Sequence, residues 1–254
     1  MRNIFEITDE MIFKFVSEED NSRMKLGTGA YSTLFRSTLF GEKETTNVMK
    51  KLETNEVKVL WFGSNPNVPK SLELIKENSA SKEFAGFLSQ KDSKYFSEVT
   101  EWNPFTQWSI YSEIIDKLYG IENTLMANYV PWGSSDFESF VKEMKDIDRA
   151  LFLRVMEFSN SLAELLIDTL KPKLVIIPRS IRNYITLCND DSRGWKERKI
   201  VGKVSFIFQV GVKEYSDYKT VFLICPHPSY APRIGKDYIQ DMKNEVVEAI
   251  KDIS

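Results

Sequence analysis

Short apolar runs, each followed by glycine, proline or polar residues, alternate along the chain with stretches of helical spacing. The runs predict strands at residues 57–62, 124–130, 174–177, 204–210 and 220–225. Helical spacing predicts helices within 8–18, 110–118, 137–170 and 236–252. Strands that alternate with helices build a mainly parallel sheet with helices on both faces. The sequence therefore predicts an α/β fold. A polar turn between the last two strands also allows a hairpin, and with it a mixed sheet.

Length and composition favour one large domain. The chain has 254 residues, of which 42% are hydrophobic and 13% aromatic, enough for a substantial core. We expect a single domain over 1–254, with 1–56 as an N-terminal extension and 57–235 as the motif-bearing core. No apolar run is long enough to cross a membrane, and the first residues do not resemble a signal peptide. These features predict a cytoplasmic protein.

Cysteine content and charge limit the expected cofactors and partners. Cys188 and Cys225 are too few for a disulfide framework, a four-cysteine zinc site or an iron–sulfur cluster, so no cofactor or metal is expected. The net charge is −3, which counts mildly against nucleic-acid binding because phosphate contacts need Lys and Arg. A local basic face is compatible with that total, so DNA stays open as a partner.

Polar segments follow four of the predicted strands. Ligands of open α/β sheets bind beyond the carboxyl ends of the strands. Each segment also holds glycine or proline, which restricts or shapes the backbone. The sequence therefore predicts a substrate-binding rim. Its segments are 63–67, 128–133, 178–180 and 226–229.

The rim contains the only histidine of the chain, His227. Any mechanism that needs a histidine must use it, although a loop histidine with a structural role is the other interpretation. Cys225 ends an apolar strand and is expected in the core rather than as a nucleophile. The first segment is not a phosphate-binding loop, because Pro69 stands where that motif needs a glycine before its lysine.

The rim segments resemble the motifs of the uracil-DNA glycosylase superfamily. Residues 63–66 (Gly-Ser-Asn-Pro) are similar to the Gly-x-Asn-Pro motif of the single-strand-selective and mismatch-specific branches. Residues 128–131 (Asn-Tyr-Val-Pro) and 227–229 (His-Pro-Ser) resemble the later Asn-x-x-Pro and His-Pro-Ser motifs, and 171–179 parallel the strand and turn between them. The resemblance covers 57–235. It implies a three-layer α/β/α sandwich around a short, mainly parallel sheet.

This resemblance implies a monofunctional DNA glycosylase, which hydrolyses the N-glycosidic bond of a flipped-out uracil or modified pyrimidine. Asn65 would orient the attacking water, and His227 would donate a hydrogen bond to the pyrimidine O2, where charge develops in the transition state. Asn128 would read the Watson–Crick edge of the base, and Phe105 would stack on it. A strand-end asparagine with a structural role is the other interpretation of Asn128. The remaining expected substrate-binding residues are Gly63, Ser64, Pro66 and Asn67.

The same resemblance implies DNA contacts after each strand. Side chains that follow Ser229 would insert into the base stack where the flipped base had been. The backbone around Ser64, Ser180 and Ser229 would bind phosphates. For each cation alone, ordinary solvated surface is the other interpretation. The expected DNA-binding residues are Lys70, Arg179, Ser180, Ser229, Tyr230 and Arg233.

Several positions depart from the family pattern. Asn67 stands where strict uracil enzymes carry a tyrosine that blocks 5-substituted pyrimidines, and 178–180 (Pro-Arg-Ser) replace the usual glycines of the third turn. The cysteines of the iron–sulfur branches are absent. The departures predict a roomier pocket that takes a 5-modified or bulky pyrimidine, as in defence against phages with modified DNA. A role in DNA repair is the other expectation from the resemblance.

Two other classes of function stay open. A non-catalytic member of the superfamily would bind DNA or protein, which suits the acidic net charge and the altered third turn. Its DNA binding would survive loss of Asn65. An unrelated α/β hydrolase or transferase would ignore DNA and pair His227 with a carboxylate that the sequence does not identify.

Overall fold

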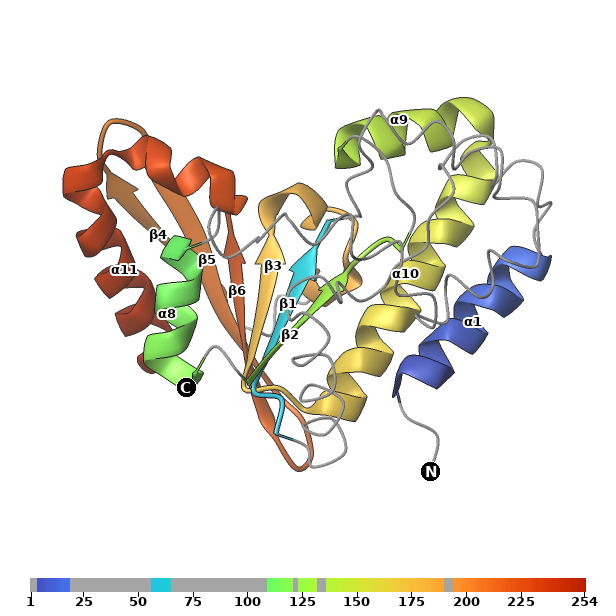
Figure 1. The fold of residues 1–254 in the computed structure, drawn as a ribbon, viewed down its shortest axis with the longest axis horizontal. Helices are drawn as coiled ribbons and strands as arrows, with labels where there is room; N and C mark the ends of the chain where they lie inside the picture. Colours follow the sequence, from blue (N-terminus) through green and yellow to red (C-terminus); the bar gives the residue numbers. More distant parts are fainter. Residues whose placement is uncertain (1–3, 19–55, 65–108, 121–122, 132–135, 190–193) are drawn as a thin grey trace, which may run out of the picture.

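The computed structural model places a sheet of six strands at the centre of the described residues (Figure 1). The strand order is β2-β1-β3-β6-β5-β4. Neighbours from β2 to β6 pair in parallel, whereas β5 pairs antiparallel with both β6 and β4. The strands are β1 Val59–Gly63, β2 Thr124–Asn128, β3 Leu174–Pro178, β4 Lys196–Val201, β5 Ser205–Glu214 and β6 Lys219–Cys225. The structure describes residues 4–18, 56–64, 109–120, 123–131, 136–189 and 194–254.

Local sequence signals set the bounds of two helices, α9 (Phe137–Ile147) and α10 (Arg149–Leu170). The Asp136 carboxylate accepts a hydrogen bond of 2.8 Å from the Ser139 amide and caps α9. Asp148 caps α10 in the same way, and α10 ends where Lys171 takes a left-handed conformation with φ of 45°. The α-helices are α1 Ile4–Glu18, α8 Ser109–Tyr119, α9 Phe137–Ile147, α10 Arg149–Leu170 and α11 Lys236–Lys251. The short 3₁₀ helices are η4 Arg179–Ile181, η5 Thr186–Cys188 and η7 Pro228–Ile234.

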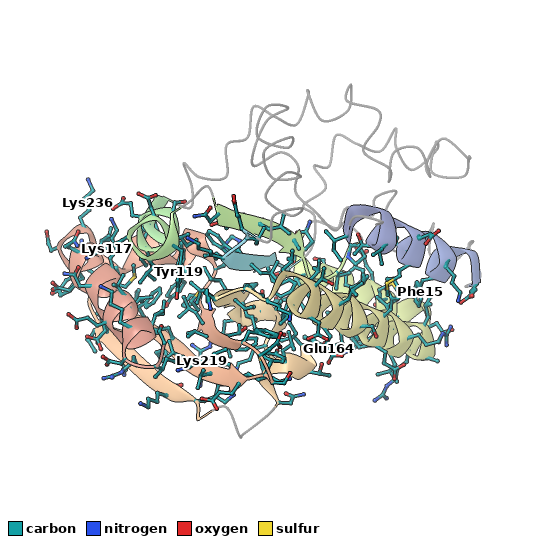
Figure 2. All side chains as sticks on the ribbon, turned by 90° about the horizontal axis from the view of Figure 1, so that it is seen from below. Phe15, Lys117, Tyr119, Glu164, Lys219 and Lys236 are labelled. Atoms are coloured by element: carbon teal, nitrogen blue, oxygen red, sulfur yellow. The ribbon has the colours of Figure 1, made fainter. Side chains whose placement is uncertain are left out.

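Helices flank the sheet on both faces. Alternate residues of a strand point to opposite faces, and those of β1 divide accordingly between two hydrophobic clusters. Leu60 and Phe62 join the cluster under α1, α9 and α10, whereas Val59 and Trp61 join the cluster under α8 and α11. Figure 2, viewed from below, shows the same division, with α8 and α11 on one side of the sheet and α10 and α1 on the other.

The structure confirms the α/β class and the mixed sheet that the polar turn allowed. β5 and β6 form the antiparallel hairpin. Three predicted bounds differ clearly from the structure: the first helix begins at Ile4 rather than residue 8, β2 ends at Asn128 rather than residue 130, and β5 ends at Glu214 rather than residue 210. Strand β4 was not predicted. Its residues are mostly charged and exposed because it is an edge strand, so it lacks the apolar alternation that indicates a strand. Across the described ranges, every helix is too short or too polar to span a lipid bilayer.

Candidate functional site

The four polar segments of the predicted rim lie at one edge of the sheet. Gly63 pairs with Asn128 across β1 and β2, and Pro178 pairs with Cys225 across β3 and β6. β1 is also in register with β3, since Trp61 pairs with Ile176 two residues before each strand ends. The four parallel strands therefore end level with one another. We call this side of the molecule the carboxyl edge; it is the upper side of the sheet in Figure 1.

Gly63 and Asn128 are in close contact at the β2 end of this edge. Asn128 is fully buried, and a Cβ atom added to Gly63 would lie 2.6 Å from the Asn128 Oδ1 atom. No side chain fits at that distance without a shift of the amide. Glycine at position 63 therefore keeps the Asn128 amide at the end of the strand, close against the backbone of β1.

A serine pair joins the exits of β1 and β3. The Ser64 and Ser180 hydroxyls form a hydrogen bond of 2.6 Å across 116 residues of sequence. Backbone bonds extend the β1–β2 pairing past the strands, from the Tyr129 amide to the Gly63 carbonyl and from the Val130 amide to the Ser64 carbonyl. Three predicted segments thus meet through direct hydrogen bonds, although they are remote in sequence.

The segment that carries His227 is held by a tyrosine of α8. The buried Tyr111 hydroxyl donates to the Pro226 carbonyl at 2.9 Å, immediately before the histidine. Burial, together with the Cys225 thiol next to it, raises the pKa of Tyr111 well above its ordinary value, so the hydroxyl stays a donor. After the histidine, the Tyr230 amide donates to the His227 carbonyl at 2.8 Å. The backbone is fixed on both sides while the His227 side chain is exposed.

Cys225 is a core residue, as expected. Its side chain is 2% exposed, and burial raises the pKa of its thiol to about 12. The nucleophilic form of cysteine is the thiolate, which such a pKa suppresses at neutral pH. Among the rim residues described, His227 is therefore a better candidate for chemistry than the thiol two residues earlier.

A buried polar network supports the exit of β2 from behind. The Tyr129 hydroxyl donates to the Tyr184 carbonyl at 2.9 Å and to Asn160 Oδ1 at 3.2 Å. The Asn160 side-chain amide of α10 donates to the same carbonyl at 3.1 Å. Burial is the main cause that raises the pKa of Tyr129. The network ties the residue after Asn128 to the chain that follows η4, and so fixes the distance between the β2 and β3 exits.

The predicted DNA contacts after β6 differ in their exposure. Ser229, Tyr230 and Arg233 belong to η7. Tyr230 is half-buried against the α8–α11 cluster, and the Arg233 guanidinium lies 5.5 Å from the centre of its ring. Tyr230 is thus partly engaged with the core, whereas Pro232 and Arg233 are exposed.

Five predicted site residues lie outside the described residues: Asn65, Pro66, Asn67, Lys70 and Phe105. The structure brings together Gly63, Ser64, Asn128 and Ser180, with Arg179 and His227 at the ends of the neighbouring strands.

The sequence interpretation missed two parts of the site. Tyr111 gave no signal, because a buried aromatic on a helical face looks like any core residue. A cleft between α9 and η4 was also missed. Its lysines, Lys142 and Lys145, lie three residues apart on the polar face of the 137–147 helix directly after β2, and that spacing was the available signal.

In the part of the chain that the structure describes, no group of three or more His, Cys, Asp or Glu side chains could hold a metal ion. Comparison of the chain with protein-family models, with curated proteins and with solved structures gives no significant match.

Proposed function

We propose that this chain is a monofunctional DNA glycosylase, which hydrolyses the N-glycosidic bond of a flipped-out uracil or modified pyrimidine. In this proposal the fold is a three-layer α/β/α sandwich of the uracil-DNA glycosylase type, and the substrate is reached in DNA repair or in defence against phages with modified DNA. The reaction uses no cofactor.

One observation carries the proposal: the four motif-bearing segments end level at one edge of the sheet. The exits of any parallel sheet share an edge, and here the residues that they bring together are those of the motifs. Here Gly63 contacts Asn128, Ser64 bonds to Ser180, and His227 follows the strand beside them. The edge is also where open α/β sheets bind ligands.

His227 supplies the stabilisation of the departing base. As the glycosidic bond breaks, negative charge builds on the pyrimidine O2, and a hydrogen-bond donor aimed at that atom acts mainly in the transition state. The exposed side chain reaches solvent from a backbone fixed by Tyr111 and Tyr230, so little reorganisation is needed. Asn65, outside the described residues, orients the water that attacks the sugar.

Asn128 selects the base through its amide, which offers one donor and one acceptor group to a pyrimidine edge. Because its side chain is fully buried, the base reaches it only when the groups that cover the end of β2 move apart. Base flipping into a closed site of this kind is costly and selective, since the enzyme must supply the unstacking energy.

The burial of Asn128 also favours a second candidate, a non-catalytic member of the superfamily that binds DNA. If the Asn128 amide stays buried in every state of the protein, its role is to stabilise the sheet and it cannot contact a base. Such a protein would bind DNA through the exposed residues of the carboxyl edge and would release no base.

Base excision from a panel of oligonucleotides, single- and double-stranded, tests the proposal. The panel carries uracil, hypoxanthine, thymine mismatches, 5-hydroxymethylcytosine and its glucosylated form, and abasic sites are revealed by alkaline cleavage. Wild type is compared with His227→Ala, Asn65→Ala and the isosteric Asn128→Asp. We expect release of one pyrimidine, lost in all three variants. DNA binding without release supports the binding protein, and activity confined to uracil contradicts the roomier pocket.

A further inference from the structure

A cleft opens between α9 and the chain that follows β3. It has a volume of about 570 Å³, within the ~300–1,000 Å³ range of clefts that hold small ligands. One wall is formed by polar and apolar residues of α9, and the other by η4 and the residues after it. The lining side chains on which the argument depends are Lys142, Lys145, Arg179, Ser180 and Asn183.

The cleft is richer in cations than the protein as a whole. The lining holds two carboxylates and three cations, whereas the chain carries a net charge of −3. The carboxylates are Glu138 and Asp146, and the cations are Lys142, Lys145 and Arg179. Among the ion pairs of the described residues, none involves Lys142 or Arg179. An excess of unpaired cations in a concave surface attracts an anion.

The three cations have different roles. The Lys145 ammonium lies 4.8 Å from the centre of the Phe152 ring and 6.0 Å from that of Tyr184. These cation–π contacts hold it against the two rings, of which Tyr184 lines the cleft. Lys142 and Arg179 are exposed and come from opposite walls, so a DNA backbone in the cleft would have a cation on each side.

Ser180 connects this cleft to the proposed active site. Its side chain lines the cleft, and its hydroxyl is bonded to Ser64 at the exit of β1. The cleft therefore adjoins the carboxyl edge of the sheet. Hydroxyl and amide groups such as those of Ser180 and Asn183 are common donors to phosphate oxygens.

We propose that the cleft between α9 and η4 binds the DNA backbone next to the flipped nucleotide, with Lys142 and Arg179 contacting its phosphates. This inference rests on the proposed function, since it takes DNA as the substrate. It adds α9, and Lys142 above all, to a DNA-binding surface otherwise built from the strand exits. The cleft is open and its cations are exposed, so the strand enters from solvent without a conformational change of α9.

Salt dependence of DNA binding tests this proposal. Binding of a fluorescent single-stranded oligothymidylate is measured by anisotropy over a range of salt concentrations, for full-length wild type, Lys142→Gln, Arg179→Gln and Lys117→Gln. Lys117 is the matched control: it is an exposed lysine near the end of α8, and α8 ends at the lower side of the sheet in Figure 1, away from the carboxyl edge. Each phosphate contact contributes about 0.7 to the slope of log K against log salt for single strands.

We expect each cleft variant to lose about 0.7 of that slope, with unchanged thermal unfolding, and Lys117→Gln to keep the wild-type slope. A methylphosphonate that replaces the contacted phosphate should abolish the difference between wild type and Lys142→Gln. Thymidine monophosphate should compete only weakly. Equal slopes in all four proteins overturn the proposal, and so does strong competition by the mononucleotide, which would make the cleft a site for free nucleotides.

Base release, measured in parallel, separates this inference from the proposed function. If the wild type releases a base and the cleft variants keep the wild-type salt slope, the proposal for the cleft is wrong and the proposed function stands. A cleft-dependent slope without release of any base supports the cleft and contradicts the catalytic proposal. Absence of DNA binding contradicts both.

Discussion

The two edges of the parallel sheet use their polar residues differently. At the amino edge, where the β5–β6 turn meets the end of α10, polar side chains bind one another. Lys171 forms an ion pair with Asp217, and the Tyr218 hydroxyl donates to Asp168 at 3.2 Å. The Tyr215 and Tyr218 rings stack with centres 4.1 Å apart, and Lys171 lies 5.3 Å from the centre of the second ring.

At the carboxyl edge, hydrogen bonds hold the backbone, and several polar or charged side chains are exposed. The Ser64–Ser180 bond and the Tyr111–Pro226 bond fix the strand exits, while His227 and Arg179 project into solvent. One edge closes the hairpin onto α10, and the other exposes charged and polar side chains, which our proposal assigns to ligand binding. Variants at the two edges should therefore affect different properties.

Loss of His227 gives the largest expected effect. His227→Ala should slow single-turnover base release about 10²–10³-fold, because removal of a transition-state hydrogen-bond donor has that cost. The side chain is exposed, so the free energy of unfolding should change by less than about 0.5 kcal/mol. His227→Gln, which keeps a donor, should retain part of the rate. Equal rates for wild type and His227→Ala would remove the histidine from the chemistry.

Gly63→Ala should destabilise the protein by about 1–3 kcal/mol, since its Cβ would lie 2.6 Å from Asn128 Oδ1. Denaturant unfolding measures this cost. In an Asn128→Ala background the clash is gone, so the same change should cost clearly less. Equal costs in both backgrounds would show that Gly63 does not hold the Asn128 amide in place.

At the amino edge, Tyr218→Ala should lower the free energy of unfolding by about 0.5–1.5 kcal/mol through loss of the stacked ring pair. Base release should be unchanged, because this residue lies at the opposite edge from the rim. Tyr218→Phe keeps the rings and should change stability by less than about 0.5 kcal/mol. A loss of base release in Tyr218→Ala, measured well below its unfolding temperature, would contradict the division between the edges.

The smallest expected effect is the alkaline titration of Cys225. Burial raises the pKa of the folded thiol to about 12, above its value in the unfolded chain. The contribution of this thiol to the free energy of unfolding is complete below the pKa of the thiol in the unfolded chain. It is lost as pH rises toward 12, because only the unfolded thiol ionises readily. Stability should fall by less than about 1 kcal/mol up to pH 9. Cys225→Ala should flatten this fall in denaturant unfolding; an identical pH profile would contradict the buried thiol.

Burial patterns explain which elements the sequence could predict. β1 and β3 are buried along their whole length and end at glycine or proline, so their apolar runs and their ends are visible in sequence. β4 has the opposite character, since Lys196 and its neighbours are exposed and charged. An edge strand whose side chains are mostly exposed has no apolar pattern by which the sequence could predict it.

The candidate site was predictable only in part for a similar reason. The position of the rim followed from the rule for parallel strands, which needs no contacts between distant residues. The bond between Ser64 and Ser180 joins residues 116 apart, and Lys142 reaches the same region from a surface helix. Such pairings depend on how helices pack against the sheet, which local spacing does not encode.

Hydrogen exchange with and without single-stranded DNA tests the central claim that the carboxyl edge binds nucleic acid. We expect slower amide exchange at residues 63–64, 128–131, 178–184 and 226–230 when oligothymidylate is added, and no change in the β5–β6 turn at 214–219. Protection confined to that turn, or the absence of protection at every strand exit, would contradict the account.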